Sequence, residues 1–249
     1  MAHGFGNICD DFYVNLRVGT QLGLPQQRET LIHFFEQIQK SFPDMTRFRR
    51  ADATELTLEE DRERESYRWL SVDAARLACG HVNPDSVADA MKLHHTVLDY
   101  APHALGLSMV EIDHVDVVFG FDLEFAGNHD EVVAESLMAE SPLAGLLEES
   151  GARAVDVQPT MTVSLTEDQR LQARVDVVTR SNGSPTRNPD YTGDAISVFL
   201  ILRRYWGDRG REPLPQLLDN LAARGERMAE AFVVPKIIQP IRAAIATRS

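Results

Sequence analysis

The sequence predicts an α+β protein made of two successive β-α-β-β(-β)-α units, with mainly antiparallel sheets and helices on one face. Two kinds of periodicity support this: strict apolar–polar alternation marks strands, and apolar residues three and four positions apart mark helices. The order of these patterns in residues 1–106 is repeated in residues 107–249. A chain of 249 residues is also long enough to bury a substantial core.

The first unit begins with an alternating strand at residues 12–22, followed by a helix at 24–42 with an apolar stripe. The remaining elements predicted for this unit are a strand at 45–50, an exposed charged connection or edge hairpin at 51–65, a hairpin of strands at 66–72 and 76–82, and a helix at 83–106. Asn83 is expected to cap this last helix, with Pro84 in its first turn, because these residue types favour those positions.

The second unit begins with an alternating strand at 109–125. The remaining elements predicted for it are a helix or helix pair at 128–149 interrupted before Pro142, strands at 152–165, 169–180 and 195–206, and a long helix from Pro213 to about Val234. Pro235 and Pro240 are expected to break that helix, because proline lacks the amide hydrogen that an α-helix needs.

The two units align without gaps at an offset of 101 residues, which places residues 14–22 over residues 115–123. The alignment matches three identical pairs: Val14 with Val115, Gly19 with Gly120, and Leu22 with Leu123. We therefore expect an internal duplication, with equivalent strands, a pseudo-two-fold arrangement and a groove between the units. A glycine at the same place in both strands indicates a bulge or a close backbone approach.

The net charge and the cysteine content limit the kinds of partner and compartment that we expect for this protein. The net charge of −13 and the pI of about 5.0 disfavour nucleic acids and anionic membranes. Cys9 and Cys79 are the two cysteines, which excludes a disulfide scaffold and fits a reducing compartment. There is no secretory signal pattern, and the longest apolar run, at 195–202, is too short to span a bilayer. We expect a soluble cytoplasmic protein with no membrane or nucleic-acid partner.

The most distinctive stretch is HVDVVFGFDLEF, at residues 114–125, which has polar groups on one side of a strongly apolar strand. These polar groups are His114, Asp116, Asp122 and Glu124. They are the first candidates for acid/base catalysis. The alternative is a wet sheet face, and it is favoured because the first unit places Asn15 and Gln21 at the positions of two of these carboxylates. We therefore expect this face to be solvent-facing and free of metal.

A metal site is the weaker hypothesis. It would combine His95 and Asp99, one helical turn apart, with His114 and Asp116 on the strand. Nothing in the sequence brings the two pairs together. No phosphate-binding loop, dinucleotide signature or nucleophile elbow is present either, so no cofactor is expected.

Two further segments carry groups suited to binding a ligand or a partner. The long connection at 181–194 contains Arg187, Asp190 and Tyr191, and it is either a binding loop or a loop without a role. A basic and aromatic cluster ends the predicted strand at 195–206: Arg203, Arg204, Tyr205 and Trp206. Strand alternation puts the first and third of these on the opposite face from the second and fourth, so they cannot form one patch, and ordinary polarity at a strand end also explains them.

The leading functional hypothesis is a non-catalytic cytoplasmic binding or assembly protein that acts through the inter-unit groove, through self-association, or both. One alternative is an enzyme or small-molecule sensor with His114, Asp116, Asp122 and Glu124 in the groove. Another is a chaperone-like acidic binding protein. The apolar stripe of the C-terminal helix continues past Phe232, and uncovered apolar surface of this kind usually marks an interface, so we expect a homodimer or a protein partner.

Overall fold

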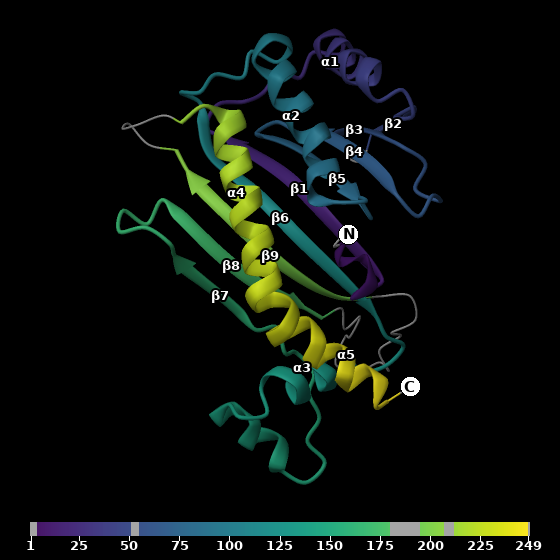
Figure 1. The fold of residues 1–249 in the computed structure, drawn as a ribbon, viewed down its shortest axis with the longest axis vertical. Helices are drawn as coiled ribbons and strands as arrows, with labels where there is room; N and C mark the ends of the chain where they lie inside the picture. Colours follow the sequence, from purple (N-terminus) through teal and green to yellow (C-terminus); the bar gives the residue numbers. More distant parts are fainter. Residues whose placement is uncertain (1–3, 51–54, 180–194, 207–211, 249) are drawn as a thin grey trace.

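One antiparallel sheet of nine strands organises the molecule (Figure 1). The computed structural model describes residues 4–50, 55–179, 195–206 and 212–248. The strand order is β2-β3-β4-β5-β1-β6-β9-β8-β7, and every neighbouring pair is antiparallel. The α+β class and the antiparallel pairing are therefore confirmed. Both halves of the chain contribute to the same sheet.

The first half of the chain forms one side of this sheet. Its elements are η1 (Phe5–Asn7), β1 (Asp11–Thr20), α1 (Arg28–Ser41), β2 (Arg47–Arg50), β3 (Leu56–Glu59), β4 (Tyr67–Val72), β5 (Arg76–Val82) and α2 (Val87–Ala104). The predicted hairpin of β4 and β5 is present. The charged stretch before it contains a strand, β3, which lies between β2 and β4.

The predicted cap of α2 is wrong. Ser86 is the N-cap residue, and its hydroxyl accepts a hydrogen bond from the Asp89 backbone N–H. Asn83 instead has a left-handed backbone with φ of 49°, and its side-chain oxygen accepts a hydrogen bond from the Phe12 N–H. Asparagine tolerates this conformation and can bond to nearby backbone, so it serves the turn after β5 better than the helix.

The second half forms the other side of the sheet. Its elements are β6 (Ile112–Glu124), α3 (His129–Leu137), η2 (Pro142–Glu148), β7 (Thr160–Ser164), β8 (Leu171–Val178), β9 (Ala195–Tyr205), α4 (Leu214–Met228), η3 (Ala229–Ile238) and α5 (Gln239–Ala246). The predicted interruption before Pro142 separates α3 from η2.

The C-terminal helix does not break at its prolines, contrary to the prediction. Helical structure runs without a gap from Leu214 to Ala246, with a π-helical segment, η3, around Pro235. Wider π-turns can accommodate a proline that would disturb a regular α-helix. The helix crosses β6 and β9 (Figure 1), and its stripe is buried on the protein's own sheet through Leu217, Leu218 and Leu221.

The core lies between the sheet and the helices on one of its faces. Val14, Leu16, Val117, Phe119 and Leu200 are fully buried there. Because alternate strand residues point to opposite faces, the residues between them lie on the other side of the sheet. None of the helices in the described ranges has a stretch long and apolar enough to cross a membrane.

The two halves meet at the centre of the sheet, where β1 pairs with β6. Leu16 lies directly opposite Val117. Outward from this pair, the first half runs β1, β5, β4, β3, β2 and the second half runs β6, β9, β8, β7. The bulge expected at the shared glycine occurs in β1, where the register shifts between Gly19 and Thr20.

A close approach of α4 to the sheet gives a test of this packing. A methyl group added at Gly225 would collide with the buried Phe119 ring. We expect Gly225→Ala to lower the free energy of unfolding by roughly 1–3 kcal/mol, as overpacked cores do, although alanine favours helices. Urea denaturation measures this change. Gly145→Ala is the control, because nothing lies within 4 Å of its added methyl. An unchanged or raised stability of Gly225→Ala would contradict the described helix–sheet contact.

Candidate functional site

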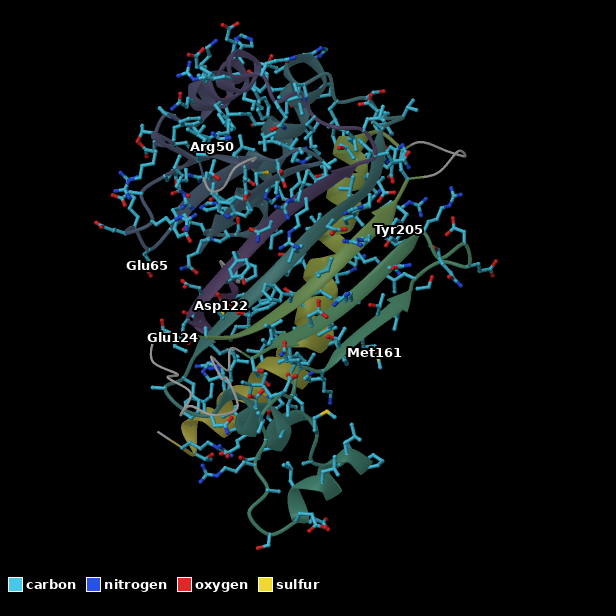
Figure 2. The ribbon with its side chains drawn as sticks, turned by 180° about the vertical axis from the view of Figure 1, so that it is seen from behind. Arg50, Glu65, Asp122, Glu124, Met161 and Tyr205 are labelled. Atoms are coloured by element: carbon cyan, nitrogen blue, oxygen red, sulfur yellow. The ribbon has the colours of Figure 1, made fainter. Side chains whose placement is uncertain are left out.

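The face of the sheet opposite the helices, called the open face below, carries the polar side of the central strands. No described helix covers it, and side chains of the strands spread across it in Figure 2. It includes the polar side of the 114–125 stretch, as alternation predicts. The strand register then decides which of its side chains meet.

Asp116 is paired with Arg203 at the centre of the open face. The two residues are opposite each other on β6 and β9. Arg203 Nε donates to Asp116 Oδ1 at 2.7 Å, and Arg203 Nη2 donates to Asp116 Oδ2 at 2.7 Å. The Asp116 side chain is only 1% exposed. The expectation of a solvent-facing carboxylate is therefore wrong at this position, because a neighbouring strand supplies an arginine that pairs with it.

Hydrogen bonds hold the Arg203 guanidinium in one orientation. Besides Asp116, its Nη1 donates to the Tyr205 hydroxyl at 3.2 Å, and the guanidinium carbon lies 5.6 Å from the centre of that tyrosine ring. The hydrogen bonds to Asp116 are the main reason that the pKa of Arg203 is raised above its ordinary value. Arg203 is thus a cation held in one position, and its main partner is the Asp116 carboxylate.

Arg17 lies on the other side of Asp116. It is opposite Asp116 in the register of β1 and β6, so the row across the sheet reads Arg17, Asp116, Arg203. Within the described residues, Arg17 makes no hydrogen bond or ion pair through its guanidinium. It is partly buried, and burial lowers its pKa, an effect that the charge of Asp116 partly offsets. The row therefore holds two arginines and one carboxylate, which is already bonded to Arg203.

His114 lies in the next row across the same face, between Gly19 and Tyr205. Its Nδ1 is 2.8 Å from Asp113 Oδ2, whereas its Nε2 is 4.0 Å from Asp116 Oδ2. The ring sits over Gly19, where a methyl group would collide with it, and its centre is 6.1 Å from that of Tyr205. We call Arg17, His114, Asp116, Arg203 and Tyr205 the central cluster.

The other two carboxylates of the stretch are not part of this cluster. Asp122 is six positions after Asp116 along one strand, a distance of about 20 Å. Asp122 accepts a hydrogen bond from the Tyr13 hydroxyl at 3.2 Å, and Glu124 is exposed. The structure therefore does not bring the four polar residues of 114–125 together as one acid/base site.

Aromatic rings border the central cluster because glycines leave room for them. A methyl group at Gly120 would collide with the Tyr13 ring, and one at Gly80 would collide with Trp69 and Asn15. The Tyr13 ring centre lies 6.2 Å from that of Phe199. The close approach expected at Gly120 is therefore made by the Tyr13 side chain of the neighbouring strand β1, and not by backbone. Arginine beside tyrosine and tryptophan is a combination typical of protein-binding surfaces.

The two pairs of the metal hypothesis lie on opposite sides of the sheet. His95 is on α2 in the helix layer, and its Nε2 is 2.7 Å from Asp219 Oδ1 of α4. Asp99 is exposed on the same helix, whereas His114 and Asp116 are on the open face. Within the described ranges, no three histidine, cysteine or carboxylate side chains gather in a way that could hold a metal ion.

The other binding candidates separate as the alternation predicts. Arg203 and Tyr205 are on the open face, whereas Arg204 is opposite Val115 and so has its side chain toward the helices. Trp206 is partly buried against the core. The loop candidates Arg187, Asp190 and Tyr191 lie outside the described residues.

Arg17 is the site residue that sequence reasoning missed. The only signal for it was its place on the polar side of the alternating strand at 12–22. Its position opposite Asp116 depends on the register between two strands that are about a hundred residues apart in the sequence. Comparisons with protein-family models and with curated proteins gave no match. The functional interpretation therefore rests on the geometry of the open face.

Proposed function

We propose that this is a non-catalytic binding protein whose open face binds an acidic segment of a protein partner, with Arg17 accepting a carboxylate. The observation that carries the proposal is the Arg17 guanidinium, which is partly buried and makes no hydrogen bond or ion pair within the described residues. Taking a cation partly out of water without a partner costs free energy, and a bound carboxylate would restore the lost interactions.

The neighbours of Arg17 favour a carboxylate. Asp116 accepts two hydrogen bonds from Arg203, so Arg17 contributes excess positive charge to the row. A guanidinium presents a fork of N–H donors that matches a carboxylate. Tyr13 and Trp69, on the same face of the sheet, offer ring surface for apolar parts of a bound chain. The breadth of the uncovered sheet suits a protein segment better than a small molecule, which usually occupies a concave pocket.

At the open face, binding is favoured over catalysis because the acid/base groups of the central cluster do not converge on one point. Within the central cluster, His114 and Asp116 are 4.0 Å apart, and each has a closer partner, Asp113 and Arg203 respectively. General acid/base catalysis requires groups within hydrogen-bond reach of the same reacting atom.

The site lies at the junction of the two halves, which we propose arose by duplication. The offset of 101 residues found in the sequence equates Leu16 with Val117, and these two residues are opposite each other in the sheet. A pseudo-two-fold axis between them would exchange β1 with β6, β5 with β9, and β4 with β8, in agreement with the strand order. A crystal structure in which the halves superpose strand for strand would support this origin, and a different strand order would contradict it.

The binding proposal predicts that Arg17→Gln loses affinity for carboxylates while the fold is retained. We suggest NMR titration of the full chain with a hexaglutamate peptide at constant ionic strength, with the arginine side-chain Nε–Hε resonances as the readout. Loss of a charge-assisted hydrogen bond costs about 1.5–3 kcal/mol, so affinity should fall about tenfold or more.

Arg174→Gln is the matched control, because Arg174 also lies on the open face but is bonded to Asp176 on its own strand at 2.7 Å. It should bind the peptide as the unmodified protein does. A hexaserine peptide should give no shift at Arg17. Equal affinities for Arg17→Gln and the unmodified chain, or shifts confined to other arginines, would reject the site.

A further inference from the structure

The two edges of the sheet are protected very differently. β2 carries Arg47, Arg49 and Arg50; Arg47 pairs with Asp61 at 2.7 Å, and Arg49 pairs with Glu59 at 3.1 Å. Charged side chains of this kind prevent an edge strand from pairing with another chain. β7, with the sequence TMTVS, has no charged residue, and all five of its residues are exposed. In the described part of the chain, this edge lacks the usual protection.

Exposed apolar side chains gather around β7. Among the described residues, seven of the ten exposed large hydrophobic side chains lie on β7 or near it: Leu143, Leu146, Leu147, Val155, Met161, Val163 and Phe232. A groove of about 510 Å³ lies between β7, β8 and the C-terminal helix, and a second pocket of about 450 Å³ lies beside η2. Pro159 lines both, so the two hollows adjoin. Contiguous apolar surface of this extent usually marks an interface.

We propose that β7 pairs antiparallel with β7 of a second copy of this chain, so that the sheet continues across a two-fold axis. Antiparallel pairing of a strand with itself is two-fold symmetric, which is the symmetry of the commonest oligomers. With the axis at Thr162, Met161 would face the partner's Val163, and Thr160 would face the partner's Ser164. Met161 and Val163 point to the helix side of the sheet, since they pair with Val175 and Ala173.

Charge favours β7 over the opposite edge as the place where two copies meet. The chain carries a net charge of −13, so two copies repel each other least where the contact surface itself is uncharged. β7 provides such a surface, whereas the opposite edge would bring three arginines against three. A stable interface buries about 800 Å² on each partner, which a five-residue strand alone does not supply. The groove beside Phe232 and the leucines of η2 provide the additional apolar area.

The proposal predicts that charges on β7 dissociate the dimer. In sedimentation velocity at micromolar concentration, the full chain should have twice the mass of 27.9 kDa, and Met161→Lys/Val163→Lys should have the mass of one chain. Both positions are exposed, at 69% and 43%, so the monomer should keep its circular dichroism spectrum. Phe48→Lys, an exposed apolar position on the opposite edge strand, is the control and should remain dimeric.

A cysteine at position 162 tests the register. Thr162→Cys should form an intersubunit disulfide on mild oxidation, and Thr160→Cys should form much less, because its opposite residue would be the partner's Ser164. A monomeric unmodified chain, or a dimer unaffected by the two lysines, would overturn the proposal. Arg17→Gln should remain fully dimeric, so the outcome is independent of the acidic-segment proposal.

Discussion

Arg203→Ala is expected to lower the free energy of unfolding by about 3 kcal/mol, because it leaves the buried Asp116 without its bidentate partner. The effect should lie at the lower end of the range for broken buried pairs. Arg203 is 34% exposed, so water can enter the space, and Arg17 lies on the other side of Asp116. Urea denaturation with linear extrapolation gives the value.

Two further variants separate the buried pair from general surface effects. Arg174→Ala removes an arginine that also bonds to a carboxylate, but at 49% exposure, and should change stability by no more than about 1 kcal/mol. Adding Asp116→Asn to Arg203→Ala should recover much of the loss, because the uncompensated charge is gone. If Arg203→Ala is as mild as Arg174→Ala, the ion pair does not stabilise the centre of the sheet.

Acid is expected to destabilise the fold because two histidines, His81 of β5 and His94 of α2, are buried between the sheet and the helices. Burial lowers the pKa of His94 to about 3 and, together with the nearby Arg68, lowers the pKa of His81 to about 4. Both are therefore neutral in the folded protein and bind protons more readily when it unfolds. Their contribution is fully present above pH 6.5 and is lost as the pH falls from 6.5 toward 4, by about 1.4 kcal/mol per pH unit for each histidine.

The variant His94→Leu removes one of these titrations. It should reduce the slope of unfolding free energy against pH between 6.5 and 4, with a difference of roughly 3 kcal/mol from the unmodified chain at pH 4 relative to pH 7. Thermal or urea unfolding at half-unit pH intervals measures the slope. His103→Gln is the control, since His103 is exposed near the end of the same helix. Identical slopes for His94→Leu and the unmodified chain would refute the burial argument.

The fold was predictable from the sequence wherever a local pattern determined the structure. Alternation in residues 114–125 correctly placed Val117 and Phe119 on one face and Asp116 on the other. Rules based on residue type failed where tertiary structure gave a residue a different role. Asn83 has the residue type of a helix cap but serves a turn, and Pro235 is accommodated by a π-helical segment rather than ending the helix.

The site was less predictable, because it depends on pairings between distant strands. The sequence placed Asp116 on the polar face of its strand and Arg203 on the same face as Tyr205, but it could not show that β6 and β9 are neighbours or that these two residues are opposite each other. Arg17 attracted no attention, since a single arginine in an alternating strand is ordinary. The importance of these residues comes from the sheet order, which is a property of the complete fold.

The central position of β1 also constrains when the protein can fold during its synthesis. This strand is synthesised about a hundred residues before β6, which is one of its two neighbours in the sheet. Asp116 cannot form its ion pair until Arg203, 87 residues further along the chain, has also been synthesised. Such long-range pairings slow folding and expose unpaired strands to aggregation. Nascent chains that end before β9 should therefore depend on chaperones or be degraded, although their first half is already complete.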